Sequence, residues 1–297
     1  AAEGAAFADL AQGVETRALL VSREGRLIAE RYGAGTGAED LLQGGELTGL
    51  ILAPLYAATL RTGKGLLDVP LGQMIPDIKA DSRGDITPRQ LLWQVSGLES
   101  PAWRPLNPFS ARARLLAGPN FARAALAYRS VWPPGSHFET SPVNAQLAAM
   151  ALTAVEGDSL AGLLLSRVWQ PMGGGRARIA LDRLGGGMAA HCCLAATARD
   201  WLRLARLYAE DGVVAEGRLW EPGFVTRDIA RATAVHPAYG DRALDAGGAG
   251  AARGCGLVRA GRCGHGSPPT VEGGFGARYA AGQSLKTIRT GQWFPNR

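Results

Sequence analysis

The sequence predicts an α/β (α+β) protein, in which an antiparallel sheet built from both ends of the chain is flanked by helices and a helical region is inserted in the middle. Three observations carry this prediction. Extended patterns lie near both termini, and helical patterns fill the centre. The third is size, because 297 residues of which 46% are hydrophobic can bury a sizeable core. This composition excludes a disordered tail and a small disulfide-stapled protein.

The first expected elements are a hairpin and a buried helix. Residues 18–22 and 26–32 are apolar or alternating and flank a turn that contains Gly25, which predicts two antiparallel strands. After a glycine-rich link, residues 47–60 are apolar on nearly every side, as is typical of a helix that is buried all round. Because Pro54 interrupts this stretch and it is too short to cross a bilayer, no membrane span is expected.

Helical patterns then fill the centre of the chain. Thr87 and Pro88 are suited to the cap and the first turn of a helix that continues to residue 92. Between residues 101 and 135 the chain is loop-rich, apart from one helical pattern. The helical patterns of the centre cover residues 121–128, 143–155, 160–169 and 197–211. Two short extended runs, at residues 277–281 and 285–290, predict strands near the C-terminus.

Charge and cysteine usage exclude several classes of function. Basic residues exceed acidic ones by 6, but they are scattered singly, so no nucleic-acid partner is expected. The adjacent Cys192 and Cys193 are expected neither to bridge to each other nor to share one tetrahedral metal ion. A metal ion could in principle be bound by Cys255, Cys263 and His265. Because no fourth ligand has a matching spacing, these three are interpreted as loop residues. No metal and no cofactor is predicted.

Five stretches follow one another in an order that carries a family resemblance. They are residues 19–32, 65–71, 86–98 (Ile-Thr-Pro-Arg-Gln-Leu-Leu-Trp-Gln-Val-Ser-Gly-Leu), 134–139 (Pro-Gly-Ser-His-Phe-Glu) and 192–201. The set resembles the class C β-lactamase-like serine hydrolases, particularly the branch with 6-aminohexanoate-dimer hydrolases and related esterases. This resemblance implies a β-lactamase/penicillin-binding-protein-like fold with a cleft between sheet and helices. It also implies a single domain over residues 1–297, with residues 1–67 and 190–297 in the α/β part and residues 68–189 in a mostly helical part.

The resemblance further implies three catalytic elements, and the sequence lacks each of them. A Ser-x-x-Lys pair should begin the buried helix, yet residues 41–46 are Leu-Leu-Gln-Gly-Gly-Glu, and no serine in the chain is followed three places later by lysine. In place of a Tyr-x-Asn element stand Thr140, Ser141 and a proline, with Asn144 two places late; an alcohol cannot ionise as a phenol does. In place of a Lys-Thr-Gly-type strand stand residues 272–277, where Gly274 replaces the basic side chain.

Two functional hypotheses from different classes follow. In the first, the chain is a β-lactamase-related homologue without catalytic residues, whose cleft binds a small amide or ester, or nothing. The expected pocket residues are Gln43, Glu46, Thr140, Ser141, Asn144, Gly274, Phe275 and Gly276. In the alternative, the protein is an active serine hydrolase of carboxylic esters, linear amides or β-lactams, whose catalytic segment is missing or altered in this sequence.

Isolated serine and histidine residues are interpreted as structural. Ser96 precedes Gly97, which suits the left-handed position after a helix. His137 and His191 flank the expected pocket and could serve as bases at a new site, but a lone histidine near a turn is more often hydrogen-bonded. Residues 1–10 have neither the positive flank nor the apolar run of a secretory signal. A soluble protein is expected, whereas neither its compartment, cytoplasm or periplasm, nor its oligomeric state is predicted.

Overall fold

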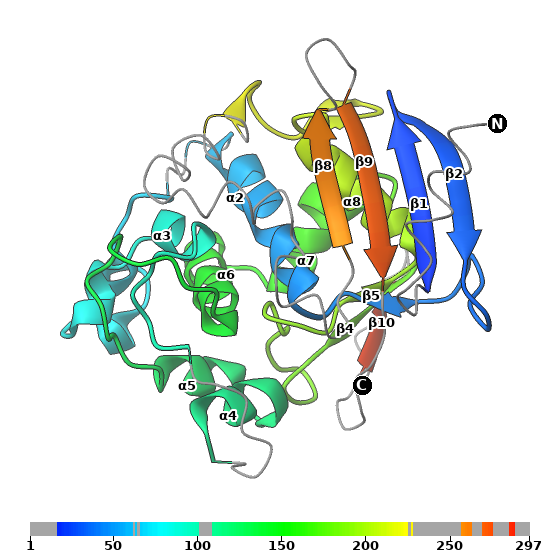
Figure 1. Cartoon of the computed structure of the whole chain (residues 1–297). Coiled ribbons are helices and arrows are strands. Elements are labelled where there is room, and N and C mark those ends of the chain that lie inside the picture. The colour runs from blue at the N-terminus through cyan, green and yellow to red at the C-terminus, as the bar shows by residue number, and fades with distance from the viewer. Residues whose placement is uncertain are drawn as a thin grey trace.

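The described part of the chain forms two four-stranded antiparallel sheets, a short hairpin and a set of helices (Figure 1). The computed structural model describes residues 17–61, 63, 66–100, 109–224 and 227, and the strands at 257–262, 269–275 and 285–288. In Figure 1, helix α8 (Ala198–Ala209) lies against the sheet at one side, and the helical region occupies the other side. This architecture confirms the expected α/β class.

The first sheet joins the two ends of the chain. Its strands are β1 (Ala18–Arg23), β2 (Arg26–Tyr32), β8 (Leu257–Arg262) and β9 (Pro269–Phe275), in the order β2-β1-β9-β8. The expected hairpin is confirmed, with Glu24 and Gly25 at positive φ in the turn. Strand β1 is buried because β2 and β9 flank it and α8 packs against it. Strand β8 forms one edge in a glycine-rich stretch, where the pattern alone predicts no strand.

The second sheet is built from short strands and reaches the start of the buried helix. Its strands are β3 (Leu42–Gln43), β4 (Ala177–Ala180), β5 (Ala195–Ala196) and β10 (Leu285–Ile288), in the order β10-β4-β5-β3. The strand expected at residues 285–290 is confirmed as β10, whereas the one expected at 277–281 lies outside the described residues. Strands β3 and β5 thus bring residues 42–43 beside residues 195–196.

The expected buried helix is confirmed, but it begins as a tighter helix. A 3-10 segment, η1 (Gly45–Ile51), continues directly into α2 (Leu52–Leu60). Pro54 is tolerated because it lies in the first turn of α2, where its missing N–H has no partner to lose. Leu55 is fully buried, and Tyr56 donates a hydrogen bond of 2.8 Å to the Ala148 carbonyl in the neighbouring helix α6. The helix therefore lies in the core, joined to the helical region.

The helical region contains the expected helices and one that the sequence pattern missed. Its helices are α3 (Pro88–Leu92), α4 (Ala111–Ala117), α5 (Phe121–Leu126), α6 (Pro142–Glu156), α7 (Leu160–Leu164) and a π-helical turn, η5 (Leu165–Trp169). Thr87 caps α3 reciprocally with Gln90, as a capping box does. Helix α4 lies in the stretch expected to be loop, where Ser110 caps it by accepting from the Ala113 amide.

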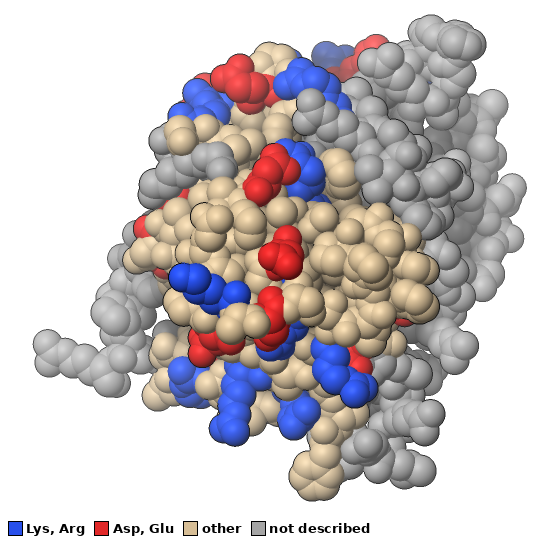
Figure 2. Space-filling model, turned by 90° about the vertical axis from the view of Figure 1, so that its left-hand side faces the viewer, with Lys and Arg blue, Asp and Glu red and all other residues tan. Residues whose placement is uncertain are grey.

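The surface carries mixed charge. On the face shown in Figure 2, basic and acidic side chains are interspersed, and basic ones are more frequent toward its lower edge. Over the described part of the chain, basic and acidic side chains also form ion pairs such as Arg89–Asp68 and Arg129–Glu99. Among the described residues, no single helix is long and apolar enough to cross a membrane; α6 and the helix after it meet that test only as a pair bent by 87°.

The core position of α2 predicts a large cost for shortening Leu55. Leu55→Ala should lower the free energy of unfolding by about 2–5 kcal/mol, because it removes buried methyl groups and leaves a cavity. Leu184→Ala is the matched control: Leu184 is 80% exposed, so its loss should change stability by less than about 0.5 kcal/mol. Urea denaturation measures both values, and equal effects would contradict the placement of α2.

Candidate functional site

The first turn of the buried helix is closed over by a tryptophan. We call residues 44–48 the helix mouth. Gly44 is buried there, and an ideal Cβ built on it would overlap atoms Cζ2 and Cη2 of Trp201. Trp201 is 1% exposed, and its indole N–H donates to the Leu42 carbonyl at 3.0 Å. Position 44 therefore has no room for a side chain while this indole stays in place.

The remaining residues of the helix mouth offer one exposed acid and one buried hydroxyl. Gly45 has a φ of +52°, which disfavours any side chain, and Leu47 is buried. The exposed Glu46 lies 3.4 Å from the guanidinium of Arg112, which comes from α4. Thr48 is buried, and its Oγ1 accepts a hydrogen bond of 3.1 Å from the Leu194 amide. This hydroxyl has a structural role as an acceptor.

No lysine of the described chain lies at the helix mouth. The sequence holds three lysines: Lys64, which lies outside the described residues, Lys79 and Lys286. Lys79 is exposed at the end of a short 3-10 helix, η3 (Pro76–Ile78). Lys286 lies on β10, three strands away from β3, which at the usual spacing places its backbone roughly 14 Å from that strand.

The segment after residue 139 enters a buried polar network. Asn144 Nδ2 donates to Gln94 Oε1, and Ser96 Oγ donates to Asn144 Oδ1, both at 2.7 Å. Ser141 Oγ donates to the Glu99 carbonyl at 3.3 Å. Ser141 and Asn144 are thus buried and engaged, as is Ser96, whose structural role was expected. Thr140 is exposed, and its carbonyl accepts from a serine hydroxyl.

The other expected pocket residues lie on two different sheets. Gln43 is exposed on β3, next to the helix mouth and opposite Ala195. Gly274 and Phe275 lie on β9, an inner strand of the first sheet, where Gly274 is opposite Leu19 of β1. Gly276, like Cys255, Cys263 and His265, lies outside the described residues. The structure therefore brings Gln43 and Glu46 together at the helix mouth and places Ser141 and Asn144 in the network that joins α6 to residues 94–99.

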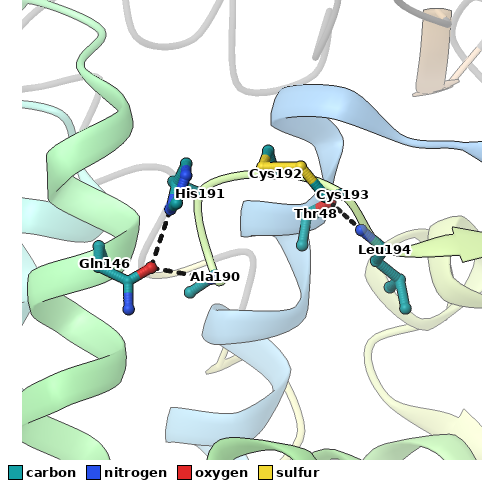
Figure 3. Close-up of a disulfide and its surroundings, with 7 residues drawn as sticks. All are labelled: Thr48, Gln146, Ala190, His191, Cys192, Cys193 and Leu194. Atoms are coloured by element: carbon teal, nitrogen blue, oxygen red, sulfur yellow. Dashed lines mark hydrogen bonds between the residues drawn. A yellow bond between two sulfur atoms is a disulfide. The ribbon is translucent and has the colours of Figure 1, made fainter. Parts of the chain in front are cut away.

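His191 is a buried base. From the sequence alone it is interpreted as a structural residue, like His137. Gln146 Oε1 accepts from the Ala190 amide at 3.0 Å and lies 2.9 Å from His191 Nδ1 (Figure 3). Because an amide oxygen only accepts, Nδ1 carries the proton, and the lone pair is on Nε2, which is buried without a hydrogen bond of ordinary geometry. Burial lowers the pKa of His191 to about 4, although the Leu115 backbone opposes part of this change.

The expectation about the adjacent cysteines is wrong. Cys192 and Cys193 are joined by a disulfide across one peptide bond, with their Cα atoms 3.7 Å apart. The chain allows this because Cys193 adopts a φ of +76°, a left-handed conformation that a spacing rule for ordinary disulfides does not consider. Figure 3 shows the disulfide on the turn between His191 and Leu194, beside Thr48. Within the described part of the chain, no group of three His, Cys, Asp or Glu residues is placed to hold a metal ion.

No local sequence pattern identifies several of the groups that define this region. Trp201 lies within the helix expected at residues 197–211, and its indole occupies the space over Gly44. The contact joins α8 to residue 44 across more than half of the chain, and no local pattern reports such a pairing. His137 lies on the surface instead, where its ring stacks on Trp132 with centroids 4.1 Å apart.

Comparison with protein families places the chain among hydrolase-type folds. The family model described as Beta-lactamase matches residues 6–281. No curated protein matches the sequence significantly.

Solved structures agree with the family match. A protein of Bacillus anthracis assigned as a 6-aminohexanoate-dimer hydrolase superposes with a TM-score of 0.64 at 20% identity, over 74% of this chain and 61% of its own. A Bacteroides dorei protein assigned as a beta-lactamase gives 0.59 at 19% identity, over 76% and 67%. EstCE1, "a hydrolase with promiscuous acyltransferase activity", gives 0.54 at 16% identity, over 70% and 71%. At these identities the likeness shows the fold, and the chain spans less than two thirds of the Bacillus protein.

The indole over Gly44 predicts that a serine there is not accommodated. Gly44→Ser should destabilise the protein by about 1–3 kcal/mol, because the new side chain overpacks against Trp201. Gly49→Ser is the control on the same helix, since a Cβ there would lie 3.5 Å from Ala145, an ordinary contact. In a Trp201→Phe background the cost of Gly44→Ser should shrink, and a double-mutant cycle in urea measures that coupling. Additive effects would contradict the contact.

The lowered pKa of His191 predicts a pH-dependent stability. Between pH 6.5 and pH 4 the unfolded chain binds a proton at this residue that the folded chain excludes, so stability should fall as the pH drops through this window. The full effect is about 3 kcal/mol, present above pH 6.5.

Urea unfolding at pH 7 and at pH 4.5 measures the difference in the free energy of unfolding between the two pH values. The proteins compared are the wild-type chain, His191→Gln and His137→Gln. His191→Gln should lose most of it, whereas His137→Gln, on the exposed stack, should retain it. An unchanged pH profile in His191→Gln would show that other groups cause the acid sensitivity.

Proposed function

The chain belongs to the beta-lactamase family, and from that premise we propose that it is a non-hydrolytic member, which binds a small amide or ester beside the helix mouth and leaves the bond intact. The observation that carries the proposal is the closed position of Gly44, where Trp201 occupies the space of a side chain. Acyl transfer needs a nucleophile whose proton a neighbouring base removes. In the first turn of the helix the Thr48 hydroxyl is buried and accepts from the Leu194 amide, and the exposed Glu46 carboxylate faces Arg112, so this turn holds no paired nucleophile and base.

The hydroxyl groups near the helix mouth support the same conclusion. Thr48 is buried and accepts from the Leu194 amide, and Ser96 and Ser141 donate to protein acceptors. A nucleophile must be reachable by substrate and paired with a base, and none of these three hydroxyls has a lysine, histidine or carboxylate among its hydrogen-bond partners. Their hydrogen bonds join elements of the core instead.

The ligand class is proposed from the relatives and from the polar groups that remain exposed. A 6-aminohexanoate-dimer hydrolase acts on an amide, and EstCE1 is described as a hydrolase with acyltransferase activity. A relative without the nucleophile keeps the surface on which such a substrate lies. We assign this surface to the exposed side chains of Gln43, Glu46 and Thr140. The amide of Gln43 and the hydroxyl of Thr140 would pair with the carbonyl and N–H groups of an amide ligand.

The absence of acyl transfer is tested with reagents that report on a reactive serine. The purified chain should neither hydrolyse a p-nitrophenyl ester above background nor take up a fluorophosphonate label, because the hydroxyls of Thr48, Ser96 and Ser141 are held by protein groups and none of the three is hydrogen-bonded to a base. Mass spectrometry of the intact chain measures labelling, with a known serine hydrolase as the positive control. A label on one serine would contradict the proposal and favour the alternative of an active hydrolase.

Binding is tested separately with the linear dimer of 6-aminohexanoate. Calorimetry should detect saturable binding, and Gln43→Ala should weaken it, whereas Gln73→Ala, at an exposed glutamine of η2 (Leu71–Gln73), should not. Absence of binding would remove the ligand from the proposal while leaving the labelling result intact.

A further inference from the structure

The disulfide between Cys192 and Cys193 lies between two anchored segments. Upstream, the Ala189 amide donates to the Ala180 carbonyl in β4, and the Ala190 amide donates to Gln146 of α6. Downstream, both the amide and the carbonyl group of Leu194 form hydrogen bonds. The turn that joins these segments consists of the two cysteines (Figure 3).

Leu194 connects this turn to the helix mouth. Its amide donates to Thr48 Oγ1 at 3.1 Å, and its carbonyl accepts from the Gly44 amide at 2.9 Å. The first bond uses the peptide between Cys193 and Leu194, and the second uses the next peptide, between Leu194 and Ala195. The direction of the first peptide depends on the backbone of Cys193, whose φ is +76°, and the second peptide follows it along the chain.

The ring that the disulfide closes constrains this backbone together with the hydrogen bonds of Leu194. A residue other than glycine seldom keeps a left-handed φ without a local constraint. Opening the S–S bond removes the covalent constraint and leaves two ordinary side chains, so Cys193 is free to turn to negative φ. The Leu194 amide and carbonyl would then leave Thr48 and Gly44.

The sulfur atoms differ in exposure. Cys192 is 6% exposed and packs with Phe121, Ala180 and Ala189, whereas Cys193 is only partly buried. An incoming thiolate therefore meets Cys193 first. Cys193 and Leu116 of α4 each pack against the cluster that contains Cys192.

We propose that Cys192–Cys193 is a redox-active site that exchanges with dithiol reductants, and that its reduction releases Leu194 from the helix mouth. A reductant thiolate attacks Sγ of Cys193, the S–S bond breaks, and Cys192 leaves as a thiolate that takes a proton. The second thiol of the reductant then attacks the mixed disulfide and displaces Cys193. Two electrons and two protons pass to the protein, and the dithiol becomes a disulfide. This inference does not depend on the ligand proposed above.

The chemical step is tested with dithiothreitol on the full chain. Differential alkylation, followed by mass spectrometry of the peptide that contains residues 192–193, should find both cysteines blocked before reduction and both alkylated after it. Reoxidation should restore the blocked form. Alkylation of both cysteines without reductant, or a disulfide from either of them to Cys255 or Cys263, would overturn the proposal.

The conformational step is tested by hydrogen exchange at the amides of Gly44 and Leu194. Reduction should speed exchange at both by about tenfold or more, because each loses its hydrogen bond. The Tyr56-containing part of α2, which has no contact with the turn among the bonds described above, serves as the internal control. Unchanged exchange at Gly44 and Leu194 after verified reduction would overturn the coupling to the helix mouth.

Two variants separate the disulfide from the backbone that it holds. Cys193→Gly removes the ring but permits a positive φ, so exchange at Leu194 should stay slow with and without dithiothreitol. Cys193→Ala removes the ring and disfavours that φ, so it should exchange as the reduced chain does. Identical exchange in the two variants would overturn the role of the left-handed backbone. Should either variant fail to fold, the comparison of oxidised and reduced wild-type chain decides alone.

Discussion

The packing of Trp201 against Gly44 is the constraint on which the arrangement of the site depends. The indole comes from α8, which packs on the first sheet, and its N–H bonds to the Leu42 carbonyl in the second sheet. One side chain thus joins both sheets to the start of the buried helix. The absence of a side chain at residue 44 makes this contact possible, since close packing leaves no space for both groups.

A second set of contacts joins residues 188–194 to the helix mouth. Residues 188–194 cross between α6 and η1, and buried hydrogen bonds to Gln146 and Thr48 set their position. Each buried polar group here is costly to leave unpaired, so the path of this segment is closely determined. The neutral imidazole of His191 and the disulfide that follows it belong to this path, which links the redox chemistry of two cysteines to the backbone of the helix mouth.

Local patterns predicted most of the fold because they agree with it. The hairpin of β1 and β2, the buried helix and the cap at Thr87 each depend on residues that are neighbours in the sequence. Helix α4 was not predicted because it is short and lies in a proline-rich stretch, although its alanine, arginine and leucine residues favour a helix. Strand β8 was not predicted because its glycine-rich stretch shows no alternation of apolar and polar residues. Its structure depends on pairing with β9.

The sequence by itself determined the fold class, the family resemblance and the lack of any serine followed three places later by lysine. The tertiary structure alone decided that Trp201 covers Gly44, that Gln146 orients His191 and that Cys192 bridges to its neighbour. The physical reason is that the first two contacts join residues far apart in the chain. The third depends on the sign of one φ angle, which the surrounding hydrogen bonds and the ring select and which residue types do not encode.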